Sequence, residues 1–476
     1  MAIEKPLNPM PSGEESEEVQ IEVVNPEAVS VTTEDSAMLI DFTGDVADNI
    51  MGPEHDANLA EYLEEAELQS LAADLIEDFN SDRESRRDWA RSYVKGLDLL
   101  GMKIEERTQP WQGASGVFHP ILTEATVRFQ AQAMGEIFPA SGPVRTKIMG
   151  VKDVEKLKQS TRVEDEMKYL LTEEMTEYRD ETEQMLFRLP LAGSSFKKVY
   201  YDPLMERPCA MFVPAEDFVV SYGASDLMTC PRYTHVMKKT PNEIRELQVN
   251  EFYIDVDLPD PQPDYSDIQE KYDEIEGETA VVEDDDRHTL LEMHVDVIMP
   301  EPFDDPDGIA RPYIITIDKS SETILSIRRN WYEEDAKKKK RQHFVHYRYL
   351  PGLGFYGTGL IHLIGGLAKS ATSILRQLID AGTLSNLPAG LKARGLRIKG
   401  DDSPLMPGEF RDVDVPGGAI RDSIAFLPYK EPSSVLYQLL GNIVEEGRRI
   451  GSVADVQVGN LNPQAPVGTT LALMER

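Results

Sequence analysis

The sequence predicts an α+β fold in which helices come first and a mostly antiparallel β region follows them. Apolar residues recur at steps of three and four over about 58–188, as in amphipathic helices. From Gly193 the pattern changes to the alternation that is typical of strands, and after Gly359 it returns to helical steps. At 476 residues, the chain has room for about two to four structural units.

The first 190 residues contain three predicted helices. In the first, Leu71, Leu75 and Phe79 are spaced four residues apart and form an apolar stripe. A turn with several Gly and Pro residues separates it from the second, which stops where Pro139 interrupts the pattern. The third is long and highly charged. We expect these helices over about 58–100, 121–137 and 152–188.

The β region is divided by an acidic insertion. Alternating apolar residues bounded by Pro and Gly predict short strands on both sides of it. The insertion, residues 251–286, holds 15 acidic residues and a single Lys, and we expect it to form solvated or disordered loops. The strands are expected at 195–202, 209–213, 218–221, 233–237, 290–299, 313–318 and 323–329.

Two further helices are predicted near the C-terminal end. Apolar residues from Leu360 to Leu378 step by three and four and form a heptad-like seam. A stretch rich in Pro and Gly, a second helix and a polar loop follow. The last eight residues have the pattern of a helix that has just begun, so we expect the chain to be truncated. The four segments cover about 359–384, 387–432, 434–450 and 454–468.

The net charge of −36 is concentrated in two places. Residues 1–80 carry a net charge of −20, and the insertion carries −14, so the rest of the chain is nearly neutral. Residues 1–60 are expected to be a disordered acidic tail. The acidity therefore does not exclude nucleic acid as a partner of the folded body.

Several classes of site and location are disfavoured. Cys209 and Cys230 are the only cysteines, which predicts free thiols and no zinc centre. The N-terminus lacks the features of a signal peptide. The apolar stretch 360–379 contains Lys369 and Arg376, so we interpret it as a packing helix rather than a membrane span. No metal, cofactor or catalytic motif is predicted.

A glycine-rich run allows two interpretations. Gly352, Gly354 and Gly357 satisfy G-x-G-x-x-G between a predicted strand and a helix, which is the dinucleotide fingerprint. However, no βαβ series follows, and Asp380 lies on the helix rather than at a strand end. We interpret the run, together with Gly359, as a hinge into the helix, and a nucleotide-dependent enzyme remains the alternative.

The basic run Lys337–Arg341 also allows two interpretations. It follows Glu333, Glu334 and Asp335, so it predicts either a solvated face balanced by its neighbours or a contact with nucleic acid.

A set of short motifs occurs in a fixed order along the chain. The motifs are Trp111–Ser115, Val117–Pro120, Glu124-Ala125, Arg128–Gln132, Glu136–Pro139, Gly142–Val144, Gly354–Leu360, Pro466–Thr470 and Ala472–Arg476. This ordered set resembles portal proteins of short-tailed double-stranded DNA bacteriophages. The likeness covers roughly residues 60–476, and its specificity comes from the order of the motifs rather than from any one of them.

The resemblance implies a dodecameric ring, without enzymatic activity, at one capsid vertex of the virion. Double-stranded DNA would pass through the ring during packaging and ejection, whatever its base sequence. Implied partners are the large terminase subunit, tail adaptors, and major capsid and scaffolding proteins. No membrane is implied as a partner, and assembly would take place in the host cytoplasm. A capsid or scaffold protein without DNA contact is a further alternative. The implied domains are the tail (1–60), wing (61–355), first stem helix (356–386), clip (387–432), second stem helix (433–452), tunnel loop (453–468) and the start of the next wing helix (469–476), with the remainder of the wing and any crown absent.

The resemblance also implies roles for individual residues. We expect sparse cations and amides from the stem and tunnel loop to meet DNA, the clip to dock the motor and adaptors, and the apolar seam to pack between subunits. The DNA channel would use Lys369, Arg376, Arg448, Arg449, Gln457, Asn460, Asn462 and Gln464; the clip Arg394, Lys399, Arg411 and Asp412; the seam Leu360, Ile364, Leu367, Ile374 and Leu378.

Overall fold

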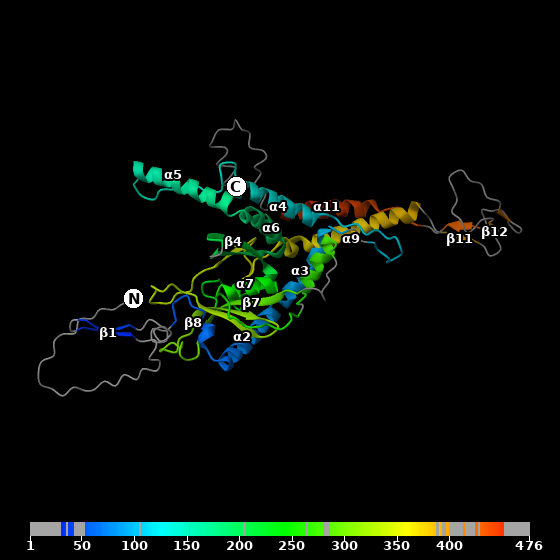
Figure 1. The fold of residues 1–476 in the computed structure, drawn as a ribbon. Helices are drawn as coiled ribbons and strands as arrows, with labels where there is room; N and C mark the ends of the chain where they lie inside the picture. Colours follow the sequence, from blue (N-terminus) through cyan, green and yellow to red (C-terminus); the bar gives the residue numbers. More distant parts are fainter. Residues whose placement is uncertain are drawn as a thin grey trace.

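The chain is described by a computed structural model, in which an α+β body carries a projecting pair of antiparallel helices (Figure 1). Helices and antiparallel sheets are both present, so the predicted α+β class is confirmed. The structure describes residues 30–34, 37–41, 53–103, 106–151, 153–202, 205–262, 264–278, 286–386, 390–392, 397–398, 413–414, 424–426 and 429–451.

Helices precede the strands of the body, as the apolar periodicity predicted. A short antiparallel hairpin, β1 (Ser30–Glu34) and β2 (Ala37–Asp41), comes before them. The helical elements are η1 (Leu59–Tyr62), α2 (Glu65–Ser85), α3 (Arg87–Leu97), η2 (Asp98–Leu100), α4 (Ile121–Ile137), α5 (Val154–Tyr169), the π-helical turn η3 (Leu170–Glu174) and α6 (Glu177–Ala192).

The prediction of one continuous helix over 152–188 is wrong. The chain leaves helical geometry at Met175, whose side chain is buried and whose amide donates to the carbonyl of Leu170 at 2.9 Å. The apolar spacing continues across this break, so periodicity alone could not reveal it. As a consequence, α5 and α6 are separate helices.

Two antiparallel sheets form the β part of the body. In one, the strands lie in the order β5-β6-β7-β8-β9, and in the other β10-β3-β4. Every described strand pair is antiparallel, whereas the sheet of a Rossmann fold is mostly parallel. The strands are β3 (Ser194–Asp202), β4 (Arg207–Pro214), β5 (Phe218–Val220), β6 (Arg232–Lys239), β7 (His288–Val297), β8 (Arg311–Asp318), β9 (Thr323–Arg329) and β10 (Phe344–Arg348).

The acidic insertion is only partly as expected. It contains α8 (Asp267–Glu276), so the expectation of loops alone is wrong for this segment. Ser266 caps the helix by accepting from the Gln269 amide at 3.2 Å, and Ile268 and Tyr272 pack into the body. The helix α7 (Pro241–Val249), which precedes the insertion, was not predicted. Its capping box between Thr240 and Glu243 was the available signal.

Two large apolar cores organise the body. The larger lies between α2 and the five-stranded sheet and includes Phe79, Ile315 and Ile327. The second joins α3, α4 and α6 to α9 (Leu360–Asn386) through buried residues such as Tyr93 and Ile121. The first half of α9 is thus anchored in the body. Among the described residues, no helix combines the length and apolar character that crossing a membrane requires.

Candidate functional site

The projecting helices form a hairpin that extends from the body to one end of the molecule. Beyond the anchored half of α9, its apolar face packs against α11 (Ser434–Gly451), with Ile374 and Leu440 buried between the two helices. Two short antiparallel pairs lie past the end of the hairpin (Figure 1). They are β11 (Gly390–Lys392) with β14 (Ile424–Phe426), and β12 (Arg397–Ile398) with β13 (Val413–Asp414).

The predicted intersubunit seam packs within a single chain instead. Leu360 and Ile364 are fully buried against the body, and Ile374 and Leu378 lie against α11. Leu367 is half-buried beside Gly447 of α11. The spacing correctly identified an apolar stripe but could not identify the surface that covers it, so the expectation that this seam joins subunits is corrected.

The glycine run forms a tight packing point where the chain enters α9. A Cβ atom at Gly357 would lie 2.2 Å from the Gly193 carbonyl oxygen, and one at Gly359 would lie 2.3 Å from the Leu191 carbonyl oxygen. The Gly357 amide donates to Ser194 Oγ at 2.8 Å, and the Thr358 amide donates to the Leu350 carbonyl at 2.9 Å. These amides are engaged inside the protein, so the run fits the hinge interpretation and not a phosphate cradle.

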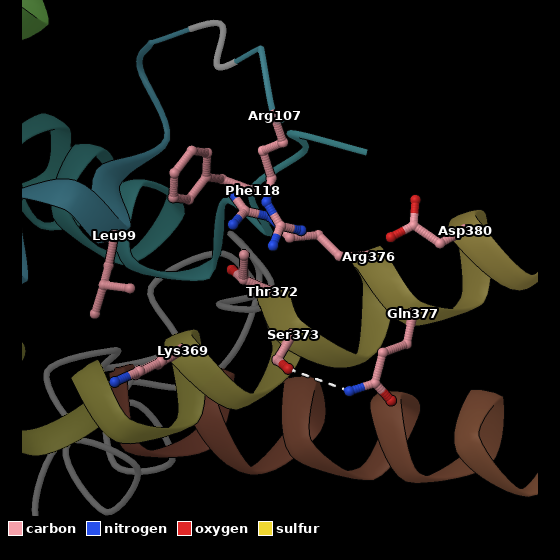
Figure 2. Close-up of a pocket in the computed structure, with 9 residues that line it drawn as sticks. All are labelled: Leu99, Arg107, Phe118, Lys369, Thr372, Ser373, Arg376, Gln377 and Asp380. Atoms are coloured by element: carbon pink, nitrogen blue, oxygen red, sulfur yellow. Dashed lines mark hydrogen bonds between the residues drawn. The ribbon is translucent and has the colours of Figure 1, made fainter. Parts of the chain in front are cut away.

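Arg376 ties α9 to the loop that precedes α4. Its Nε donates to the Val117 carbonyl at 2.8 Å and its Nη2 to the Gly116 carbonyl at 3.2 Å. The guanidinium also lies 4.4 Å from the centre of the Phe118 ring. Figure 2 shows this packing at a surface pocket of about 340 Å³. Arg376 therefore has a structural role that the sequence did not reveal.

Two more contacts fix the same loop to α9. Asp380 accepts from the Ser115 amide at 2.8 Å, and the His119 amide donates to Thr372 Oγ1 at 3.1 Å. Burial, aided by the nearby Arg448, lowers the pKa of His119. Sequence reasoning did not single out Thr372, because a lone Thr in a helix carries no specific signal.

The remaining predicted cations differ in their surroundings. Lys369 is exposed at the rim of the pocket and forms no hydrogen bond or ion pair with any residue that the structure describes. Arg448 pairs with Glu124 of α4 at 3.0 Å, which holds α11 to the body. Arg449 is exposed, and among the residues that the structure describes its ion-pair partner is Glu446, one turn earlier, at 2.7 Å. Lys369 and Arg449 are thus the two of these four cations that face solvent without holding elements together.

Eight predicted site residues lie outside the described residues. They are Arg394, Lys399, Arg411, Asp412, Gln457, Asn460, Asn462 and Gln464.

The basic run at 337–341 is balanced by its neighbours. Lys338 pairs with Asp305 at 3.3 Å, and Lys340 pairs with Asp296 at 3.1 Å. Arg341 stacks on Tyr332, with 4.5 Å between its guanidinium carbon and the ring centre. These contacts favour the solvated face over the nucleic-acid contact.

No group of three or more candidate metal ligands occurs within the described part of the chain. The most prominent feature of the described residues is therefore the hairpin of α9 and α11, which is anchored in the body and points to the distal strand pairs.

A comparison with protein families identifies this architecture. The family model described as phage SU10 portal protein matches residues 144–447, which is more than half of the chain. The chain belongs to this family of phage portal proteins. A search of curated proteins finds no match.

The range that matches the family model includes most of the projecting hairpin of this portal protein. Both sheets, α9 and most of α11 lie inside residues 144–447, whereas α2, α3 and α4 lie before it. Portal proteins are structural components of the phage particle, and the alternative of a nucleotide-dependent enzyme gains nothing from either the fold or the match.

Proposed function

We propose that this portal protein assembles into a dodecameric ring at one capsid vertex, through which double-stranded DNA is packaged and later ejected. The observation that carries the proposal is the two-helix hairpin. It projects from an α+β body, the short strand pairs β11/β14 and β12/β13 lie past its far end, and all of it except the end of α11 lies inside the range that matches the portal family.

In this proposal, the hairpin α9/α11 is the stem and residues 387–432 form the clip. The body over 61–355 is the wing, and 453–468 is the tunnel loop. The stem would line the channel, and the clip would dock the large terminase subunit during packaging and tail adaptors afterwards. Capsid and scaffolding proteins would contact the wing as the particle assembles in the host cytoplasm.

The electrostatics of the stem suit a channel that lets DNA slide. Every phosphate that a cation neutralises releases counterions and strengthens binding, so a continuous cationic lining would hold the duplex in place. Arg376 and Arg448 are occupied in tying the stem to the body. This leaves Lys369 and Arg449 as sparse, exposed contacts to the DNA backbone, which are independent of sequence.

A charge reversal in the stem tests the proposed contact. Lys369→Glu places a negative charge where DNA would pass, and the Lys369 side chain is exposed and forms no hydrogen bond or ion pair with any described residue. We expect rings to assemble normally and the amount of nuclease-protected DNA per particle to fall several-fold. The matched control is Lys95→Glu on the exposed face of α3, which should leave packaging unchanged.

Particles that carry Lys369→Glu and package DNA as the wild type does would contradict the stem contact. Shortening the segment 454–468 extends the test. If that change also left genome retention intact, a capsid or scaffold role without DNA contact would be favoured instead.

A further inference from the structure

The helix α5 forms an arm that extends away from the body. It projects past α4 and α6, away from the two sheets (Figure 1), and none of its residues is buried. The segment before it runs back along it, where Thr146 Oγ1 donates to Glu164 at 3.0 Å. The end of the arm that is farthest from the body therefore contains residues 145–163, which we call the arm tip.

The arm tip exposes apolar side chains that the fold leaves uncovered. Met149 and Val151 are 83% and 81% exposed, and Val154, Leu157 and Val163 are 65%, 50% and 47% exposed. A 16-residue helix is only marginally stable in water unless its apolar side is packed. Exposed apolar groups gathered at one site indicate a surface that another protein covers.

The arm tip is also basic, although the chain as a whole is strongly acidic. Six cations compare with two acidic residues, Asp153 and Glu155, and the structure describes five of the six. None of the five forms an ion pair with a residue that the structure describes. They are Arg145, Lys147, Lys156, Lys158 and Arg162.

The outer face of α2 has the opposite character. Residues 61–82 contain eight acidic residues and no Lys or Arg. Asp78 and Asp82 pair with Arg232 of β6. By contrast, Glu65, Asp74 and Glu77 are exposed, and no described cation pairs with them. The exposed Ala66, Ser70 and Ala73 lie between these carboxylates and leave room for apolar side chains.

We propose that the arm tip docks on the outer face of α2 in a second copy of this chain. The two surfaces lie on opposite sides of the body (Figure 1), so they cannot meet within one chain. A contact between two different surfaces is heterologous, and such contacts generate a ring when the rotation from one copy to the next closes. The inference rests on the proposed ring and assigns one of its subunit contacts.

A charge swap tests this contact. The first variant carries Lys156→Glu, Lys158→Glu and Arg162→Glu, the second carries Glu65→Lys, Asp74→Lys and Glu77→Lys, and the third carries all six changes. Sedimentation velocity of the purified proteins at low salt measures assembly. We expect the first two to need at least tenfold higher concentration to assemble, and the third to recover assembly. Circular dichroism confirms that each variant is folded.

The outcomes separate the contact from the ring. If the wild type forms rings and both single-face variants do so equally well, the arm contact is wrong and the ring stands. A wild type that stays monomeric at every concentration would overturn both. If reversing the arm tip leaves assembly intact but weakens binding to a DNA duplex, the arm contacts nucleic acid and the proposal is wrong.

Discussion

At the residue scale, a buried polar cluster connects the two sheets. Glu292 of β7 accepts hydrogen bonds from Lys198 of β3 and from His294, the latter at 3.1 Å between Nε2 and Oε1. His235 lies opposite Glu292 in the β6–β7 register, and its buried Nδ1 has no partner among the described residues. Although burial alone would raise it, the pKa of Glu292 is well below its usual value because Lys198 and His294 stabilise the carboxylate.

This cluster predicts acid lability. Burial, with a smaller effect from Lys198, lowers the pKa of His235 to about 3. As pH falls below about 6.5, the unfolded chain binds a proton that the folded chain cannot, so stability is lost. At pH 5 this amounts to about 2 kcal/mol from His235. Protonation of Glu292 adds a loss at lower pH, below its unfolded value.

The measurement is urea unfolding at pH 7 and pH 5 for the wild type and His235→Gln. We expect the variant to lose about 2 kcal/mol less than the wild type between the two pH values. Equal losses would show that His235 does not titrate as its burial requires.

At the scale of elements, a close approach of two backbones marks the point where α9 leaves the body. Gly359 opens α9 against the end of α6, where the Pro190 and Leu191 carbonyls and the Gly193 amide lie within 2.8 Å of a Cβ position. All three neighbours are backbone atoms and cannot rotate away. Close approach of two backbones, rather than phosphate binding, thus explains why glycine is needed here.

A pair of glycine substitutions tests this explanation. Gly359→Ala should lower the free energy of unfolding by about 1–3 kcal/mol, because the new methyl group overpacks the contact. Gly354→Ala in the same run is the control, since nothing lies within 4 Å of its Cβ position. Urea unfolding followed by circular dichroism measures both. Equal stability of the two variants would contradict the close approach.

The positions of most helices and strands were predictable from the sequence. The alternation of strands and the spacing in α4, α9 and α11 reflect one-sided burial, so periodicity located these elements to within a few residues. The acidic composition of α8 hid its apolar stripe, which includes Ile268 and Tyr272. The role of Arg376 depends on carbonyls about 260 residues earlier in the chain, and no local pattern encodes such a contact.

At the scale of the whole molecule, the projecting hairpin is separate from the two surfaces that we propose to contact neighbouring copies. One core of the body buries the first half of α9, and the outer half packs against α11 and extends toward the distal hairpins. The arm and the acidic face of α2 lie on opposite sides of the same body. In a ring, this arrangement would give each copy one surface for each neighbour while the stem remains available to DNA.

The most direct test of the portal ring is electron microscopy of the purified protein, with mass photometry of the same sample. We predict closed rings with a central hole and a mass near twelve copies of the 53.5 kDa chain. A population that remains monomeric, or assembles into particles without a central hole, across protein concentration and ionic strength would contradict the proposed DNA channel.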